Sequence, residues 1–456
     1  MPHPIIYQDE RLRQYLQYFR ALFSRPQYEH FVTVLIALLM TQEGYTLAHL
    51  NHAVSGKKSL SSLSRFLAEA PWNHQSLIQY NFSRFCRAIQ SKIEEERLKL
   101  LEEVKKRKRR GRRSTPLVTG YLIGDDSTMH KPKGVKMQGL GRHHSTTQRK
   151  RVTGHSLVQC FYTVLGRSCP LEPVLYRQEK TAKKERVSFM SKIDIMIQQI
   201  QNFTPLSGTI THVLLDSWYS AKEIWKAALA RGFLITTGLK CNRSLRVPCP
   251  NDPKGWKWQR IDEYAASLPE SAYKQLSLPR NPRHKVWVHV VDTHIKTLYR
   301  CKLLIMRESL DDPISDARYW ASSDIQADTQ LLLEHISARW DIEVFFADTK
   351  ALLGIDQYQL ITTTALLRYW TLCWIAYSFL EETRNLLSCY DKQETKKHDE
   401  EKGDHEDYKD QRDYHVTIGQ ARRYVQRTHQ KVFLEWIYQQ AFSGIPAEEL
   451  FASLVA

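Results

Sequence analysis

The order of apolar segments between residues 117 and 239 constrains the fold most strongly. Short apolar runs bounded by turn residues predict five strands, at Val118–Ile123, Leu157–Leu165, Leu171–Tyr176, Thr211–Leu215 and Phe233–Thr237. Segments with helical spacing lie between the later strands, at 179–203 and Ala221–Arg231. Three strands followed by alternating helices and strands predict an α/β fold, in which helices flank a mixed sheet.

The remaining segments surround this core on both sides. The chain has 456 residues, which is enough for two or three domains. The pattern predicts a helical region at 1–104, a basic linker at 105–116, the first part of the core at 117–239, a β-rich insertion at 240–315, the second part of the core at 316–388, a charged and disordered segment at 389–414, and a C-terminal helical region at 415–456.

Positive charge is concentrated in one part of the chain. The net charge is +17, and residues 101–200 carry 22 lysines and arginines against 8 acidic residues. The densest run has eight cations in nine positions: Lys105, Lys106, Arg107, Lys108, Arg109, Arg110, Arg112 and Arg113. A local basic excess favours a polyanion partner, most simply nucleic acid. A nuclear-localisation signal is an alternative for the run itself, but a phosphate-binding linker agrees better with the wider basic region.

Two aspartates follow apolar strands. Asp125 comes directly after the run that ends at Ile123-Gly124, and Asp216 follows Leu215. The carboxyl ends of strands are where ligands bind in α/β sheets, so we expect both side chains at one edge. Asp126 is an alternative to Asp125, although strand alternation would point it to the opposite face.

A helical row at 339–350 carries a third carboxylate. At about 100° per residue, Arg339, Glu343 and Lys350 fall on one row, with Ile342 and Phe346 on its flank. Glu343 would thus lie between two cations, beside a stripe of apolar residues that we expect to be buried. This arrangement suits an acidic side chain that is held rigidly at the edge of the core, near an anionic group. The alternative is an ordinary surface ion pair, since Arg339 and Glu343 are also four residues apart.

Three carboxylates brought together would repel one another and raise each other's pKa unless a cation neutralised them. Hard oxygen ligands favour Mg²⁺, which Mn²⁺ can replace. Two such ions, held by Asp125, Asp216 and Glu343, can support displacement at a phosphodiester, while nearby lysines and arginines hold phosphate. We find no nucleophile-elbow or phosphate-loop motif.

No segment predicts membrane insertion or disulfide chemistry. The apolar stretches Phe31–Met40 and Leu366–Leu380 are short, and we expect both to be buried helices. The eight cysteines are scattered without a Cys-x-x-Cys pair, which fits a reducing cytoplasm.

These motifs resemble the DDE transposases of bacterial insertion sequences. The family's Tyr-x₂-Arg-x₃-Glu-x₆-Lys signature has the spacing of Arg339, Glu343 and Lys350, with Ile336 at the Tyr position. Asp125-Asp126-Ser127-Thr128, with Lys131-Pro132-Lys133-Gly134, is similar to the family's first motif. Leu214-Leu215-Asp216-Ser217-Trp218-Tyr219 is similar to its second.

The resemblance implies an RNase H-like core, a strand insertion before the Glu, and metal-dependent cleavage at transposon ends followed by strand transfer into target DNA. It implies catalytic Asp125, Asp216 and Glu343, and DNA contacts from Arg339, Lys350, Lys131, Lys133 and the basic run. Residues 1–104 would then bind DNA, and a homodimer would hold two double-stranded ends near the nucleoid. His335 could supply the contact missing at Ile336, although we expect it to be a helix-surface residue.

Two other functions fit parts of this pattern. A DNA-binding repressor or domesticated factor would need no catalysis, but Asp125, Asp216 and Glu343 are all present. A structure-specific nuclease would cleave without strand transfer, and the helical N-terminal region with its basic linker favours end-specific DNA binding over that alternative.

Overall fold

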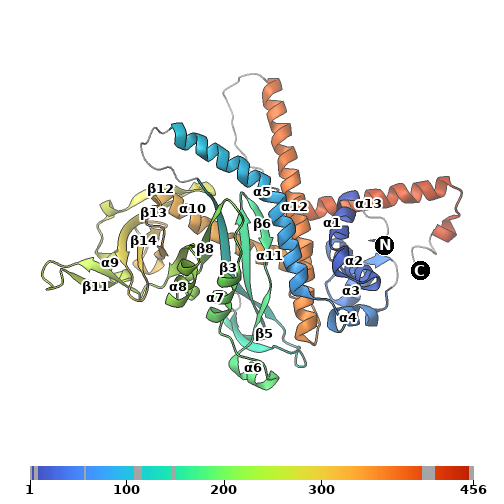
Figure 1. Cartoon of the computed structure of the whole chain (residues 1–456), viewed down its shortest axis with the longest axis horizontal. Coiled ribbons are helices and arrows are strands. Elements are labelled where there is room, and N and C mark those ends of the chain that lie inside the picture. Colours follow the sequence, from blue (N-terminus) through green and yellow to red (C-terminus); the bar gives the residue numbers. More distant parts are fainter. Residues whose placement is uncertain are drawn as a thin grey trace.

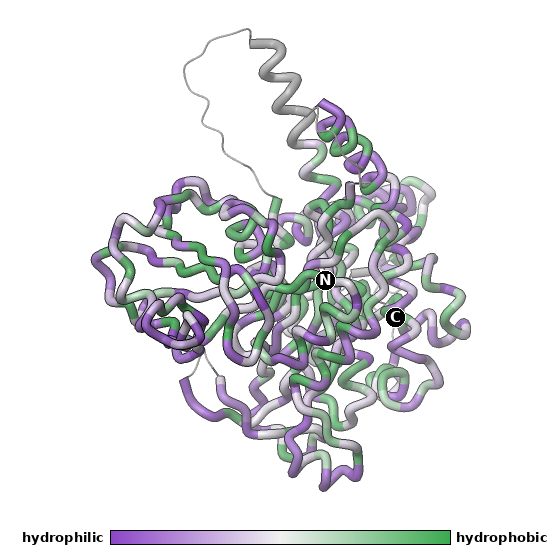
Figure 2. The backbone as a smooth tube through the Cα atoms, turned by 60° about the vertical axis from the view of Figure 1, so that its left-hand side comes forward, coloured by the Kyte–Doolittle hydropathy of each residue, from purple (hydrophilic) through white to green (hydrophobic). Residues whose placement is uncertain are grey.

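A computed structural model describes residues 3–4, 9–55, 58–106, 116–145, 149–402 and 416–450. A large mixed sheet occupies the centre, and helices flank it (Figure 1). The N-terminal region is helical, so the predicted fold class is confirmed. Figure 2 shows the hydrophobic stretches of backbone gathered in the interior and the hydrophilic ones on the outer loops.

Five helices form the N-terminal region: α1 (Glu10–Tyr18), α2 (Arg25–Met40), α3 (Leu47–His52), α4 (Leu60–Ala68) and α5 (His74–Lys106). Ser24 and Gln27 form a capping box at the start of α2, and Phe31–Met40 within it is wholly buried as predicted. Two short strands, β1 (His3–Pro4) and β2 (Val54–Ser55), pair beside these helices.

The central sheet takes most of its strands from the middle of the chain. They are β3 (Val118–His130), β4 (Gly141–Ser145), β5 (Lys150–Val164), β6 (Arg167–Pro170), β7 (Val174–Tyr176), β8 (Thr209–Leu215), β9 (Leu234–Leu239), β12 (Lys274–Leu278), β13 (Asn281–His294), β14 (Arg300–Arg307) and β15 (Arg318–Ser322). The path through the sheet is β12-β13-β14-β15-β9-β8-β3-β5-β4, with β6 and β7 also on β5. Among the described strands of this sheet, only β3–β8 and β8–β9 pair in parallel.

The region 240–315 is rich in strands, as expected. β10 (Ser244–Pro248) and β11 (Trp256–Arg260) form a separate hairpin, followed by α9 (Ile261–Ser267). β12, β13 and β14 continue the central sheet through the β14–β15 pairing, so the insertion and the core share one sheet.

Each face of the sheet is covered by its own helices. One face packs on α7 (Lys192–Asn202), α8 (Lys222–Ala230) and part of α5. The short helix α6 (Glu179–Glu185) precedes α7 in the chain. The other face packs on α10 (Thr329–Arg339), α11 (Asp341–Leu353) and α12 (Thr363–Lys402). On β3, Leu122 faces the first layer and Ile123 the second, which is the alternation of a strand buried on both faces.

Two expectations about helices differ from the structure. The helix predicted at 179–203 is two helices, because Arg186 adopts a left-handed conformation (φ 56°) that ends α6. The sequence predicts a disordered segment at 389–414, but α12 continues through 389–402, in a run of lysine and glutamate that favours helix. Residues 403–414 of this segment lie outside the described residues. In the predicted C-terminal helical region, α13 (Ile418–Phe442) projects from the body (Figure 1).

Leu366–Leu380 is buried within α12, as predicted for a core helix. Among the described helices, none combines the length and apolar character needed to cross a membrane.

Candidate active site

The parallel pairing of β3 with β8 brings Asp125 and Asp216 to neighbouring positions. The register ends at Gly124 opposite Leu215, and each aspartate is the next residue along the chain, Asp125 within β3 and Asp216 just after β8. Side chains two residues apart share a face, so Asp125 lies on the face of Ile123, which packs toward α11 and α12. Asp216 begins a short 3₁₀ turn and accepts hydrogen bonds from the backbone N–H groups of Trp218 (3.0 Å) and Tyr219 (3.3 Å).

Asp125 does not stand at the end of its strand, although the sequence suggested that it would. β3 runs on to His130, because β5 pairs with it as far as the His130–Gly154 pair. The edge arises instead because the other neighbour, β8, ends at Leu215. The β3–β8 register ends at the Gly124–Leu215 pair, so Asp125 is the first residue of β3 beyond it.

The environment of both aspartates makes the charged form less favourable than it is in water. Burial raises the pKa of Asp125 to about 7, and the charges of Asp216 and Asp126 add to the rise. Burial also raises the pKa of Asp216, although the two backbone N–H groups whose hydrogen bonds it accepts oppose the rise. A nearby cation would remove this cost, so the pair is suited to hold one.

Asp126 points to the other face of the sheet and has partners of its own. Its carboxylate accepts a hydrogen bond from the Tyr219 hydroxyl (2.9 Å) and forms an ion pair with Lys192 of α7 (2.5 Å). Sequence reasoning assigned no role to either partner. Tyr219 is recognisable only as part of the second motif, and Lys192 gives no signal in the sequence, because its contact depends on how α7 packs.

Glu343 lies in the first turn of α11, and its carboxylate is paired with Arg339 at the end of α10. The distance from the guanidinium to Oε1 is 2.5 Å. The Arg339 side chain is 11% exposed and that of Glu343 is 35% exposed. This is not an open surface pair, because its cation is largely buried.

Lys350, two turns along α11 from Glu343, reaches back to β3. Its ammonium donates to the hydroxyl of Ser127 at 2.8 Å. Ser127 is two residues beyond Asp125 and so lies on the same face of β3. The helix that carries Glu343 is therefore fastened to the strand that carries Asp125.

The donor set of this region fits a hard divalent cation. Asp125 and Asp216 supply carboxylate oxygens, and Glu343 supplies a third from the facing helix. In the described part of the chain, no three His, Cys, Asp or Glu side chains are grouped closely enough to hold a metal ion. Asp125 and Asp216 would hold such an ion, and Glu343 would complete its site on leaving Arg339.

The predicted DNA-contacting lysines differ in exposure. Lys133 is exposed. Lys131 is 8% exposed, and its ammonium donates to the carbonyl oxygens of Asp356 and Tyr358 (2.6 Å to the second). We therefore do not retain Lys131 as a phosphate contact: it ties the loop after α11 to the end of β3.

The basic run is only partly within the described residues. Lys105 and Lys106 form the exposed end of α5. Arg107, Lys108, Arg109, Arg110, Arg112 and Arg113 lie outside the described residues.

His335 is buried, whereas the sequence suggested a place on the helix surface. It is 1% exposed and packs on His212 of β8, with ring centroids 4.0 Å apart. Burial lowers the pKa of His335 to about 4, which keeps the ring neutral. His335 is therefore a core residue and does not replace the contact absent at Ile336.

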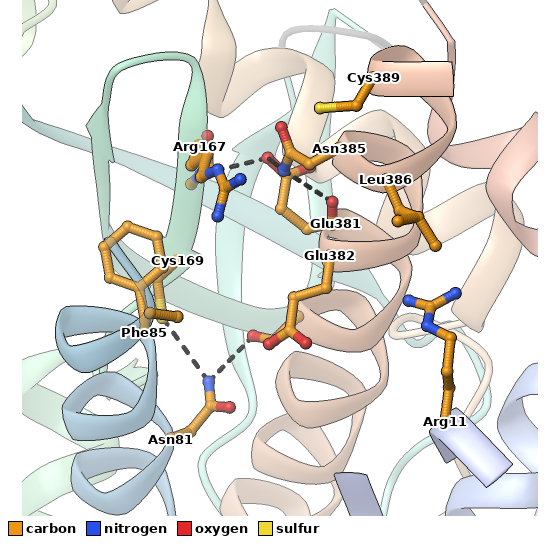
Figure 3. A pocket seen from close by; sticks show the side chains of 13 residues that line it. Arg11, Asn81, Phe85, Arg167, Cys169, Glu381, Glu382, Asn385, Leu386 and Cys389 are labelled. Carbon is orange, nitrogen blue, oxygen red and sulfur yellow. Dashed lines mark hydrogen bonds between the residues drawn. The ribbon is translucent and has the colours of Figure 1, made fainter. Parts of the chain in front are cut away.

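A pocket between α1, α5, β6 and α12 is lined by none of these site residues (Figure 3). Glu381 lies beside it, accepting from the Ser168 backbone N–H (3.1 Å) and pairing with Arg384 (2.6 Å). Asn81 donates to Ser378 at 2.9 Å. These contacts join α12 to β6 and α5, which is a structural role.

The fold and the site define a class: an α/β protein with two adjacent, half-buried carboxylates where a parallel strand pairing ends, and a third acid on a helix that covers the same face. The family model described as DDE superfamily endonuclease matches residues 17–287, which is more than half of the chain. The chain belongs to this family. The match includes Asp125 and Asp216 and ends before Glu343. A search of curated proteins gave no match.

Proposed function

We propose that this protein is a DNA transposase that cleaves the ends of a mobile element and joins the freed 3′-hydroxyl to target DNA. Membership of the endonuclease family supports action on DNA phosphodiesters. The observation that carries the proposal further is the register that makes Asp125 and Asp216 neighbours on the face covered by α11, the helix of Glu343 and Lys350.

Each charged group has a distinct task in this proposal. Bound Mg²⁺ or Mn²⁺ would activate the attacking oxygen and stabilise the leaving oxygen of an in-line displacement. Asp125 and Asp216 would hold the cation, and the pairing of β3 with β8 makes them neighbours. Lys350 holds α11 against β3, which keeps Glu343 facing the pair. Asp125 must be ionised to act as a ligand. Because its pKa is raised to about 7, the cation competes with a proton for this carboxylate, and cation binding should strengthen as pH rises.

Substitution of the carboxylates tests the site. Asp216→Asn and Glu343→Gln should each abolish Mg²⁺-dependent cleavage of duplex DNA bearing the element's ends, since each removes a charged ligand but keeps the shape of the side chain. DNA binding, measured in the same buffer with Ca²⁺, should persist. Retained cleavage in either variant would overturn the assignment.

Strand transfer is tested separately from cleavage. A pre-cleaved end with a free 3′-hydroxyl should be joined to a supercoiled plasmid by the wild-type protein, and the same end with a 3′-dideoxy terminus should not. Cleavage without joining would favour a structure-specific nuclease. Binding without either reaction would favour a silent DNA-binding factor.

A further inference from the structure

The surroundings of Arg339 suggest a role that differs from a simple contact to DNA. Its guanidinium is paired with Glu343 at 2.5 Å, and its side chain is only 11% exposed. Its Nε is buried without a hydrogen-bond partner in the described structure. A buried cation with an unused donor is costly unless strong charges compensate for the lost solvation.

The charge that directly compensates Arg339 is the carboxylate of Glu343, whose Oε1 lies 2.5 Å from the guanidinium. Besides Glu343, the positive charge of Arg339 acts on both aspartates: burial raises the pKa of Asp125 and of Asp216, and Arg339 opposes each rise. Two aromatic rings line its position, with the guanidinium carbon 5.7 Å from the centroid of Trp320 and 5.8 Å from that of Trp340. Arg339 is thus a largely buried cation that is paired with Glu343 and whose charge also acts on Asp125 and Asp216.

We infer that Arg339 is a resident counter-ion of the carboxylate site, which a divalent cation must displace from Glu343 before that carboxylate can become a ligand. This inference rests on the proposed function, because it takes the three carboxylates as the metal site. Oε1 of Glu343 cannot serve the guanidinium and a metal ion equally, since both positive groups compete for the same electrons.

Displacement has a consequence for the substrate. The guanidinium released from Glu343 remains beside Trp340, whose side chain is 57% exposed, at the border between the site and solvent. A free guanidinium there can donate two parallel hydrogen bonds to a phosphate. Binding of the divalent cation therefore frees the guanidinium that binds phosphate, which couples cation binding to DNA binding.

Metal titration of the full chain without DNA tests the inference. Calorimetry measures Mn²⁺ binding to the wild type and to Asp216→Asn. The binding that is lost in Asp216→Asn is assigned to the carboxylate site, and its affinity is the quantity compared. Arg339→Met should lower the dissociation constant at least about 5-fold, because it removes a competing charge. Arg339→Lys should stay near wild type. Arg339→Gln removes the charge but can still donate a hydrogen bond to Glu343, and it should bind Mn²⁺ more tightly, as Arg339→Met does.

Arg280→Met is the matched control. Arg280 pairs with Asp341 and is 47% exposed, so its removal should leave Mn²⁺ affinity unchanged. An Arg339→Met variant that is folded by circular dichroism and binds Mn²⁺ no more tightly than wild type would overturn the counter-ion role. Equal Mn²⁺ binding by wild type and Asp216→Asn would instead overturn the carboxylate site itself, and with it the proposed function.

Discussion

The ammonium of Lys350 donates a 2.8 Å hydrogen bond to the hydroxyl of Ser127, joining α11 to β3. Ser127 follows Asp125 by two residues on one face of the strand, and Lys350 follows Glu343 by two turns of the helix. This contact therefore sets the position of the helical carboxylate relative to the strand carboxylate. Burial lowers the pKa of Lys350, so keeping its ammonium charged costs free energy in the folded protein. The charged group is nevertheless placed where it contacts Ser127.

The contact can be removed from either side. Ser127→Ala removes the acceptor and should lower the cleavage rate about 10-fold through looser positioning of Glu343, with DNA affinity unchanged. Lys350→Met should lower cleavage at least as much. If Lys350 acted only by binding phosphate, Ser127→Ala would leave cleavage at the wild-type rate and only Lys350→Met would weaken DNA binding.

The raised pKa of Asp125 predicts how the stability of the metal-free protein depends on pH. Because the folded-state value is about 7 and the ordinary value is 3.8, the folded protein binds this proton more tightly than the unfolded chain. The contribution to stability is present below about pH 4 and is lost as pH rises toward 7.

Thermal melts in EDTA measure this effect. Asp125→Asn should melt close to wild type at about pH 4 and a few degrees higher, about 2–4 °C, at pH 7 and above. A gap between the two proteins that does not change with pH would show that Asp125 does not titrate in this way.

The sequence predicted the parts of the site that depend on local pattern. Apolar runs located the strands that precede Asp125 and Asp216, and helical spacing placed Glu343 and Lys350 on one helix. The expected single row with Arg339 is wrong, because Arg339 ends α10 and a new helix, α11, begins at Asp341. The sequence could not predict that β3 continues past Asp125, because that depends on pairing with β5, a segment whose register is set by tertiary structure. The burial of Lys131 was missed for a similar reason.

Long-range packing also explains the other errors. Histidine is intermediate in its tendency to be buried, so nothing local showed that His335 would lie against His212 in the core. The insertion was recognisable from its strands, but its continuity with the central sheet depends on the β14–β15 pairing. Pairing partners far apart in sequence carry no local signal.

The two adjacent aspartates should respond differently to substitution. Asp125→Asn should lower metal-dependent cleavage by about 10³-fold or more, because a ligand charge is lost. Asp126→Asn should stay within about 10-fold of wild type, since its carboxylate serves Tyr219 and Lys192. It should instead lower the free energy of unfolding by about 1–3 kcal/mol, because Lys192 loses its partner. Equal loss of cleavage in both variants would mean that Asp126 also reaches the metal.

Lys131 and Lys133 offer a matched pair. Lys131→Met should destabilise the protein by about 1–3 kcal/mol in urea unfolding, because the buried carbonyl oxygen of Tyr358 and the partly buried one of Asp356 lose their charged donor. Lys133→Met should change stability by no more than about 0.5 kcal/mol, since its side chain is exposed. If Lys133 contacts phosphate, only its variant should reduce the salt dependence of DNA binding.

The basic run that starts at the exposed end of α5 should contribute a large share of non-specific DNA affinity. Replacing residues 105–113 by a glycine-serine linker of the same length removes eight cations and keeps the connection to β3. Every phosphate that is no longer neutralised should reduce the slope of log affinity against log salt by about 0.9, so four such phosphates would reduce it by roughly 3.6. Fluorescence anisotropy with a duplex between 50 and 200 mM salt, on the order of the range where this effect is large, measures the slope. An unchanged slope would mean that the run does not bind DNA, and the basic excess would then have to act through Lys133 and the exposed lysines and arginines of the sheet.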